Sequence, residues 1–234
     1  MDDLKRVHTY YCARRKVLEM MRDRNYKVPK ILFETTEKEF EIMFNKKQMD
    51  LTGINDNNGL PVYVKIIEPS RQFTTLLHKE IFKEIAKYFN IIIPSIQDEK
   101  TLTAALDEGK IRLIIIYHTR HQEQSKAKHL EKYITDPYIE AYQVNNLSIS
   151  PKDSKYQDKW RLILDPQEIA DIYARYDAKP IMFGSVCIDD PMNRYYGGRP
   201  AENGKPAQIF EITRGGVSIF YRKVISKTMN IKKQ

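Results

Sequence analysis

The sequence has 234 residues, with 39 Lys or Arg against 31 Asp or Glu and a formal net charge of +8. Aromatic residues make up 11% of the chain, too much buryable area for a disordered polyelectrolyte, and 9 Gly with 11 Pro exclude collagen-like and linker-like chains. No stretch supplies the roughly 20 apolar residues of a membrane span, and the N-terminus lacks the apolar run of a secretory signal, so we expect no membrane partner. The excess of basic residues makes a polyanion such as nucleic acid the expected class of partner.

The N-terminal half alternates helical and extended patterns. Apolar residues recur at three- and four-residue steps between Leu4 and Arg24, which is typical of an amphipathic helix. The run 111–117 (IRLIIIY) is almost continuously apolar and too short for an ordinary helix, so it predicts a strand buried on both faces. We expect, in chain order, a helix over 4–24, a short helix with a Thr36–Glu39 capping box, a strand over 61–68, a helix from Thr75, and strands over 111–117 and 138–144. This alternation favours an α/β domain with helices packed on a small mixed sheet.

Residues 148–159 (SISPKDSKYQDK) are polar and aperiodic, which indicates a linker. Beyond it, Asp165-Pro166 predicts a helix start, with Asp165 as the N-cap and Glu168 closing a capping box. Further elements are a strand over 183–188, a turn of helix between Asp190 and Gly197, and strands over 208–213 and 218–224 joined by a two-residue turn at Gly215-Gly216. The expected division is an α/β domain over 1–147, the linker over 148–159, a small α+β domain over 160–226 and a basic tail over 227–234.

The patterns of common catalytic sites are missing. The chain contains no GxSxG, GxxxxGK[ST] or GxGxxG motif, and its two cysteines, Cys12 and Cys187, are too far apart to suggest a zinc site or a disulfide framework. A reducing, intracellular setting is therefore expected. His118, His121 and His129 form the one histidine cluster, which is better explained by exposure in a polar, basic segment than by a metal. We expect a protein that is not an enzyme, with no catalytic residue, metal, cofactor or small-molecule substrate.

A metal-dependent nuclease is the alternative from another functional class. Its chemistry needs an acidic residue and an Asp/Glu-x-Lys doublet on neighbouring strands to hold a divalent cation. Asp98-Glu99-Lys100 has the right residue types but precedes a helix-like segment, and the apolar strands over 62–67 and 111–117 carry no carboxylate. This alternative predicts Mg²⁺-dependent DNA cutting that disappears on Asp98→Ala.

Basic residues are concentrated in three segments, 1–30, 118–132 and 214–234. Each could contact phosphates, and each could equally be a solvated face or tail. Only the second combines basic residues with an expected loop that leaves a buried strand. We therefore expect DNA contacts there, from Arg120, His121, Lys126 and Lys128. A stand-alone basic DNA-binding module is a further option that the residues leave open.

The C-terminal part carries an ordered set of motifs. Residues 190–197 (DPMNRYYG) are followed by 204–212 (GKPAQIFEI) and by Tyr221-Arg222. This pattern resembles the C-terminal assembly domain of the fifth subunit shared by eukaryotic nuclear RNA polymerases, a domain that has a counterpart in the archaeal enzyme. The upstream stretch 164–180 is similar to the helix that precedes the family's motif, and 14–26 is similar to the opening helix of the eukaryotic N-terminal jaw domain.

The resemblance implies a non-catalytic polymerase subunit. An α/β jaw domain would lie along the downstream DNA duplex, and a small α+β assembly domain would dock onto the largest subunit beside other polymerase subunits. Tyr and Arg are over-represented in interface cores, although Tyr195 and Tyr196 could equally pack inside their own domain. The expected subunit interface consists of Arg194, Tyr195, Tyr196, Gly197, Lys205, Gln208, Tyr221 and Arg222.

The sequence also departs from the family pattern. Residues 198–203 are inserted after the motif, and the hairpin turn is shortened to Gly215-Gly216. The family's Thr-Pro-Ser-Ala motif is replaced by 124–128 (QSKAK), in which Ser125 and Ala127 correspond, so Ser125 joins the expected DNA contacts. A composition rich in Lys, Ile and Asn suits a large DNA virus or a divergent protist. The resemblance implies a nuclear location, or a virion or cytoplasmic replication site for a viral protein.

Overall fold

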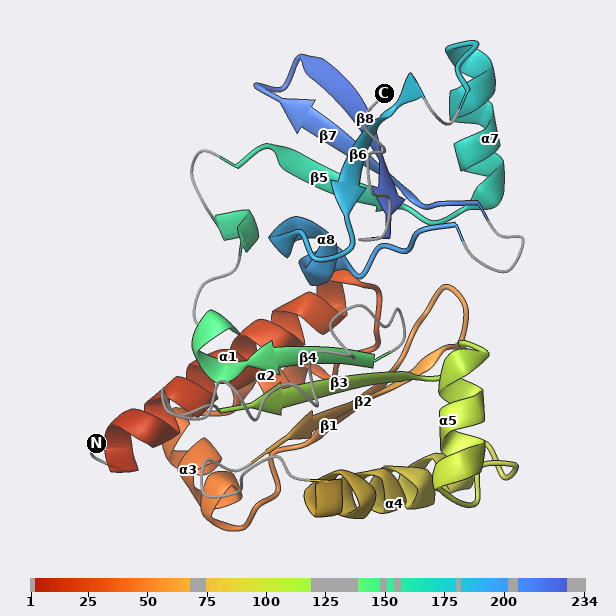
Figure 1. Cartoon of the computed structure of the whole chain (residues 1–234). Coiled ribbons are helices and arrows are strands. Elements are labelled where there is room, and N and C mark those ends of the chain that lie inside the picture. Colours follow the sequence, from red (N-terminus) through yellow and green to blue (C-terminus); the bar gives the residue numbers. More distant parts are fainter. Residues whose placement is uncertain are drawn as a thin grey trace. The chain divides into compact units, whose positions relative to one another are not determined.

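The computed structural model describes residues 3–67, 75–118, 139–147, 151–153, 157–179, 182–201 and 206–226. The protein is a mixed α/β chain with helices and two small mixed sheets, as Figure 1 shows. It divides into two compact units, Met1–Ile149 and Ser150–Gln234. Among the helices in the described ranges, none has the length and apolar character needed to cross a bilayer.

The sheet of the first unit has the order β1-β2-β3-β4. Its strands are β1 (Leu51–Ile54), β2 (Pro61–Ile66), β3 (Arg112–Tyr117) and β4 (Ile139–Gln143). β1 is antiparallel to β2, whereas β2, β3 and β4 are mutually parallel. Every residue of β3 is buried, which confirms the strand predicted to be covered on both faces.

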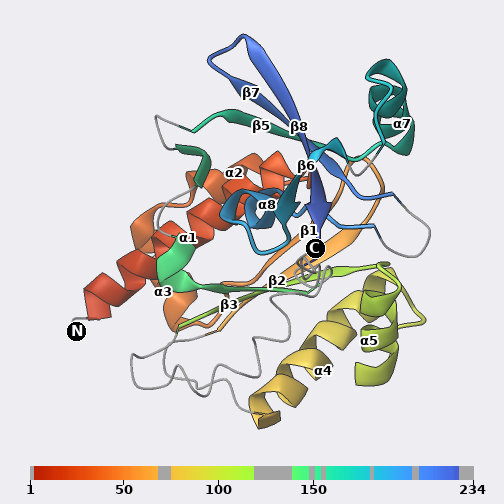
Figure 2. The ribbon, with the colours of Figure 1, turned by 45° about the horizontal axis from the view of Figure 1, so that its top comes forward.

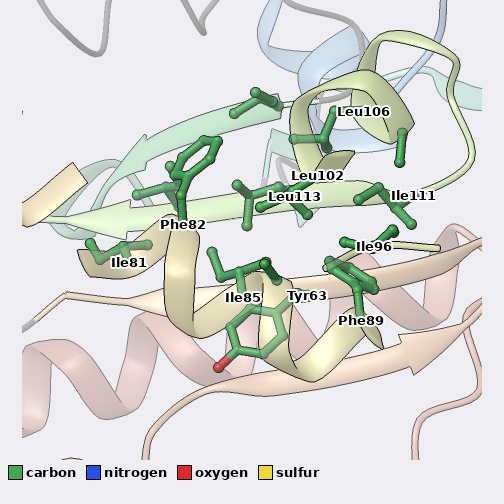
Figure 3. Close-up of a cluster of buried hydrophobic side chains, with 14 of the residues drawn as sticks. Tyr63, Ile81, Phe82, Ile85, Phe89, Ile96, Leu102, Leu106, Ile111 and Leu113 are labelled. Atoms are coloured by element: carbon green, nitrogen blue, oxygen red, sulfur yellow. The ribbon is translucent and has the colours of Figure 1, made fainter. Parts of the chain in front are cut away.

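Helices cover both faces of this sheet. They are α1 (Asp3–Asp23), α2 (Lys30–Glu34), α3 (Glu37–Asn45), α4 (Thr75–Ile92) and α5 (Glu99–Asp107). In Figure 3, α4 and α5 lie on the near side of the strands and α1 runs behind them. A short 3-10 helix, η1 (Val144–Leu147), follows β4. The predicted Thr36–Glu39 capping box at the start of α3 is confirmed, with each side chain bonded to the backbone of the other residue.

The core between α4, α5 and the sheet follows the two-residue period of the strands. Tyr63, Leu113 and Ile115 point to this face, where Ile85 and Phe89 of α4 pack against them. Figure 3 shows Tyr63 and Leu113 of the strands facing the side chains of Ile85 and Phe89. Alternate residues such as Ile114 and Ile116 are also buried, because α1 covers the opposite face.

A buried ion pair joins the end of α1 to β4. Arg24 donates from Nη1 and Nη2 to the two carboxylate oxygens of Glu140 at 2.7 and 2.8 Å, and from Nη2 to Tyr142 Oη at 3.2 Å. A second guanidinium, that of Arg112, lies 3.6 Å from Glu140 Oε1. Burial opposes ionisation of Glu140, but the two arginines and the Tyr142 hydroxyl outweigh it and lower the pKa of Glu140 to about 2.

The second unit contains the sheet β5-β7-β8-β6. Its strands are β5 (Lys159–Ile163), β6 (Gly184–Cys187), β7 (Ile209–Arg214) and β8 (Ser218–Ile225), and its helices are η2 (Pro151–Asp153), α7 (Pro166–Arg175) and α8 (Pro191–Tyr196). β7 pairs antiparallel with β5 and β8, whereas β6 pairs parallel with β8. Figure 2 shows the tip of the β7–β8 hairpin extending past the neighbouring strands.

Two local predictions in this unit are wrong. Arg214 pairs with Ser218, so the hairpin loop has three residues, Gly215 to Val217, and not two. Both glycines have positive φ, of 57° and 72°, as a tight turn requires. At α7, Asp165 accepts from the Gln167 amide as expected, but Glu168 does not close a capping box. Its carboxylate accepts from Arg161 of β5 at 2.7 Å, because a charged donor outcompetes the backbone amide.

Two strands were not predicted. β1 (LTGI) is four residues long and contains Gly53, which leaves too little pattern to read. β5 begins at Lys159, the last residue assigned to the expected linker 148–159, and its alternation of charged and apolar residues continues the polar stretch before it. Within that linker, Pro151–Asp153 forms η2.

Candidate protein interface

Helix α8, which carries the family-like motif, is held at both ends by its own sequence. Asp190 accepts from the amides of Met192 and Asn193 at 2.8 and 3.4 Å, and Pro191 occupies the first helical position, where no amide is needed. Gly197 ends the helix in the left-handed conformation, with φ of 71°. The predicted helix start and glycine stop are therefore confirmed.

The segment after α8 is packed against the sheet with no room for a side chain. Asn193 is buried, and its Nδ2 donates to the carbonyls of Ile188 and Gly198 at 3.0 and 3.2 Å. A Cβ atom on Gly198 would lie 2.4 Å from Asn193 Oδ1 and 3.1 Å from side-chain atoms of Leu162 and Val224. Gly198 thus lets the backbone approach both the helix and two strands.

The two tyrosines of the motif face different surroundings. Tyr195 is only 6% exposed, and the ammonium group of Lys152 lies 5.4 Å from its ring centroid. Tyr196 is half-buried, packs edge-to-face against Tyr195, and reaches Phe210 of β7 at 6.0 Å between centroids. Tyr195 therefore packs mainly inside its own unit, whereas Tyr196 keeps part of its surface available.

Gln208 connects the loop after α8 to the sheet. Its backbone amide donates to the backbone carbonyl of Arg199, and its side-chain Oε1 accepts from the backbone amide of Arg199, both at 2.9 Å. Its own carbonyl accepts from Val224 of β8 at 2.9 Å. Gln208 thus makes three hydrogen bonds within the unit, and these hold the loop after α8 against the sheet. Lys205, the next expected interface residue along the chain, lies outside the described residues.

Tyr221 and Arg222 lie side by side in β8 but differ in exposure. The half-buried Tyr221 packs on Phe183 and Tyr176 with centroid separations of 5.9 and 5.6 Å, and its hydroxyl donates to Glu211 at 3.2 Å. Burial and the nearby Glu211 carboxylate raise the pKa of Tyr221 to about 12. Arg222 is exposed. Of the predicted interface residues that the structure describes, Arg222 is exposed and Tyr195 is buried, and the others, Arg194, Tyr196, Gly197, Gln208 and Tyr221, are half-buried.

The tip of the β7–β8 hairpin is apolar and exposed, which the sequence analysis did not predict. Val217 is 88% exposed, and Ile219 and Phe220 of β8 are exposed as well. Neighbouring strand residues point to opposite faces, so exposure of consecutive residues means that both faces of the tip are uncovered. Arg214 lies over the Phe220 ring at 5.4 Å. The sequence signal that could have revealed this tip was a run of apolar residues in a segment that contains no Asp or Glu.

The predicted DNA-facing residues Arg120, His121, Ser125, Lys126 and Lys128 all lie outside the described residues, as does His129. His118 is half-buried directly after β3, where the chain leaves the sheet at the carboxyl ends of the parallel strands. The structure therefore shows where the chain leaves the sheet to enter the predicted DNA-facing segment, but not the segment itself.

The carboxylate invoked for a nuclease has a structural role. Asp98 is the N-cap of α5 and accepts from the Thr101 amide at 2.8 Å; this bond and that from the Thr101 hydroxyl lower the pKa of Asp98. In the described ranges, no three His, Cys, Asp or Glu side chains are grouped so that they could hold a metal ion. A scan against protein-family models found no match for this chain, and a search of curated proteins returned none either.

Proposed function

We propose that this protein is a non-catalytic subunit of a multisubunit DNA-dependent RNA polymerase. Its first unit would contact the downstream DNA duplex, and its second unit would dock onto the largest subunit. The observation that carries the proposal is the order of the motifs, from the opening helix to Tyr221-Arg222. The C-terminal motifs also belong to one compact unit, Ser150–Gln234, in which they pack on one another.

The side chains of the second unit suit a docking role. Tyr195 and Gln208 are engaged within the unit, so they stiffen the surface around them. Phe220, Arg222 and Val217 are exposed on the hairpin. Aromatic and arginine side chains often supply most of the energy of an interface when a partner buries them. The hairpin tip is therefore the surface that we expect the partner subunit to cover.

Purification of the tagged chain from its native source tests this proposal. The two largest polymerase subunits are expected to co-purify with it. Ile219→Ser with Phe220→Ala should reduce that recovery at least tenfold, since hot-spot truncations cost about 2 kcal/mol or more each. Ile91→Ser, which removes an 83% exposed apolar side chain at the end of α4, is the matched control and should leave recovery unchanged. Recovery of a free monomer alone would refute the proposal.

The DNA role rests on the basic segment that follows β3. Arg120, His121, Ser125, Lys126 and Lys128 are proposed to contact phosphates of the downstream duplex, where lysine and arginine position DNA without reading its sequence. In the polymerase, Arg120→Ala with Lys126→Ala should shorten the lifetime of the promoter complex and reduce its salt slope by about 0.9 per lost phosphate contact. Lys83→Ala with Lys87→Ala removes the same charge from the exposed side of α4 and should have no effect. An unchanged lifetime in the first variant would contradict the DNA assignment.

A further inference from the structure

A thiol, an imidazole and a carboxylate form a chain of contacts between α1 and α3. The Cys12 thiol is 3.5 Å from His8 Nε2, and the other ring nitrogen, Nδ1, is 2.9 Å from Glu37 Oε1. His8 and Cys12 are four residues apart, so they share one face of α1. Glu37 comes from the first turn of α3. A nucleophile beside a base that a third group orients is the arrangement that activates thiols in proteins.

One tautomer of the neutral His8 ring fits both contacts. A carboxylate can only accept, so His8 Nδ1 carries the proton that it donates to Glu37. In the neutral imidazole, Nε2 then has its lone pair free to accept, and it faces the Cys12 thiol. His8 is therefore oriented as a base towards the sulfur, and Glu37 is the positioning residue that sets the tautomer.

The packing of α3 on α1 keeps Glu37 in place. The Thr36–Glu39 capping box fixes the first turn of α3, which is the turn that contains Glu37. One turn further on, Phe40 is buried against the ring of Tyr11, with 5.8 Å between centroids. Figure 1 shows the two helices side by side within the first unit. The carboxylate is thus held by the fold and not by a flexible loop.

The environment of Cys12 makes a neighbouring base useful. Burial and the Glu37 carboxylate raise the pKa of the Cys12 thiol, and the cations Arg15 and Lys16 only partly oppose them. The thiol is therefore largely protonated near neutral pH and needs a group that takes its proton as it reacts. Access is open, because the His8 and Glu37 side chains are 61% and 47% exposed and Cys12 is half-buried.

We propose that Cys12 is a modification site that reacts with small disulfides, with His8 as the general base. The Cys12 sulfur attacks one sulfur of the disulfide while His8 Nε2 takes the thiol proton. The disulfide bond breaks, and the departing thiolate receives that proton from His8. The products are a mixed disulfide on Cys12 and one free thiol, so Cys12 is oxidised and half of the disulfide is reduced.

Cys187 provides a matched control thiol in the same chain. It is exposed in β6, and no histidine of the described ranges is hydrogen-bonded to its sulfur. The experiment follows the reaction of the full chain with 5,5′-dithiobis(2-nitrobenzoate) at pH 7, with EDTA present to remove trace metals. Cys187→Ser isolates the reaction of Cys12, and Cys12→Ser isolates that of Cys187.

In the Cys187→Ser background, His8→Gln should slow the reaction of Cys12 by about tenfold or more, as expected for loss of a general base. Thr9→Ala, on the same helix turn, should leave the rate within twofold. In the Cys12→Ser background, His8→Gln should not change the rate of Cys187. Equal rates with and without His8, or equal slowing of both cysteines, would overturn the proposal.

Imidazole rescue separates a base from a structural role. Added imidazole should restore most of the Cys12 rate in His8→Ala and leave the rate of the parent chain unchanged. A slowed variant that imidazole does not restore, with an unchanged circular dichroism spectrum, would overturn the assignment of His8 as the base.

Discussion

Glu140→Gln tests the buried ion pair between α1 and β4 most directly. The substitution keeps the shape of the side chain and removes its charge, so the buried guanidinium groups of Arg24 and Arg112 lose the negative charge of Glu140. The Arg24 side chain is 2% exposed and that of Glu140 is 13% exposed, so solvent screens the pair only weakly. Breaking one side of such a pair typically costs about 3–5 kcal/mol.

The pKa of Glu140 leads to a similar value for the stability that the ion pair contributes. Its shift from 4.5 to about 2 corresponds to about 3 kcal/mol of stability, because one pKa unit is about 1.4 kcal/mol. The pKa is lower in the folded state, so this contribution is complete above pH 4.5 and is lost as the pH falls towards 2. The difference between the parent chain and Glu140→Gln should therefore be largest near neutral pH and should narrow on acidification.

Urea unfolding with two probes measures this effect. Far-UV circular dichroism reports on both units, whereas the single tryptophan, Trp160, belongs to the second unit. Glu140→Gln should move the dichroism transition and leave the fluorescence transition in place. Glu34→Gln removes an exposed partner of Lys30 and should change stability by less than about 0.5 kcal/mol. A loss below about 1 kcal/mol for Glu140→Gln at pH 7, or a loss that does not narrow by pH 3, would refute the reasoning.

Four other substitutions test packing and backbone geometry by urea unfolding. Phe40→Ala should destabilise the first unit by about 3–5 kcal/mol, because the ring is fully buried between α1 and α3; a loss near zero would contradict that packing. Gly198→Ala should destabilise the second unit by about 1–3 kcal/mol, seen in Trp160 fluorescence, since its Cβ would meet Asn193 at 2.4 Å. Gly216→Ala, at φ of 72°, should cost about 1 kcal/mol, whereas Gly184→Ala has ordinary contacts and should cost less; the reverse order would be inconsistent with the hairpin geometry.

Local signals in the sequence were sufficient where one segment determines its own structure. The apolar run of β3, the Thr36–Glu39 box and the Asp190-to-Gly197 helix each depend on neighbours within a few residues, and each was predicted correctly. Short strands behaved differently. β1 and β5 are strands because β2 and β7 pair with them, and the partner cannot be read from four or five residues.

Contacts between distant residues could not be predicted for the same reason. Arg24 and Glu140 are 116 positions apart, and each alone looks like an ordinary charged residue. Glu37 is 29 positions from His8, so the carboxylate that orients the imidazole could not be identified from the segment that carries His8 and Cys12. At the candidate interface, the motif predicted a set of residues but could not indicate that Tyr195 packs internally or that the hairpin tip is exposed. Which of these side chains is buried depends on which faces of the sheet are covered by other elements.

The order of strands in the second sheet also constrains how the protein can be made. β5 and β6 do not pair with each other, and within the described sheet their partners are β7 and β8, the last two strands that the structure describes. A ribosome delivers residues from the N-terminus, so the first unit can complete its sheet when β4 emerges. Among the described residues of the second unit, no strand has a partner until the hairpin from Ile209 to Ile225 has been synthesised. A nascent chain stopped before Ile209 would hold a finished first unit and two unpaired strands, which makes it a ready substrate for chaperones and proteases.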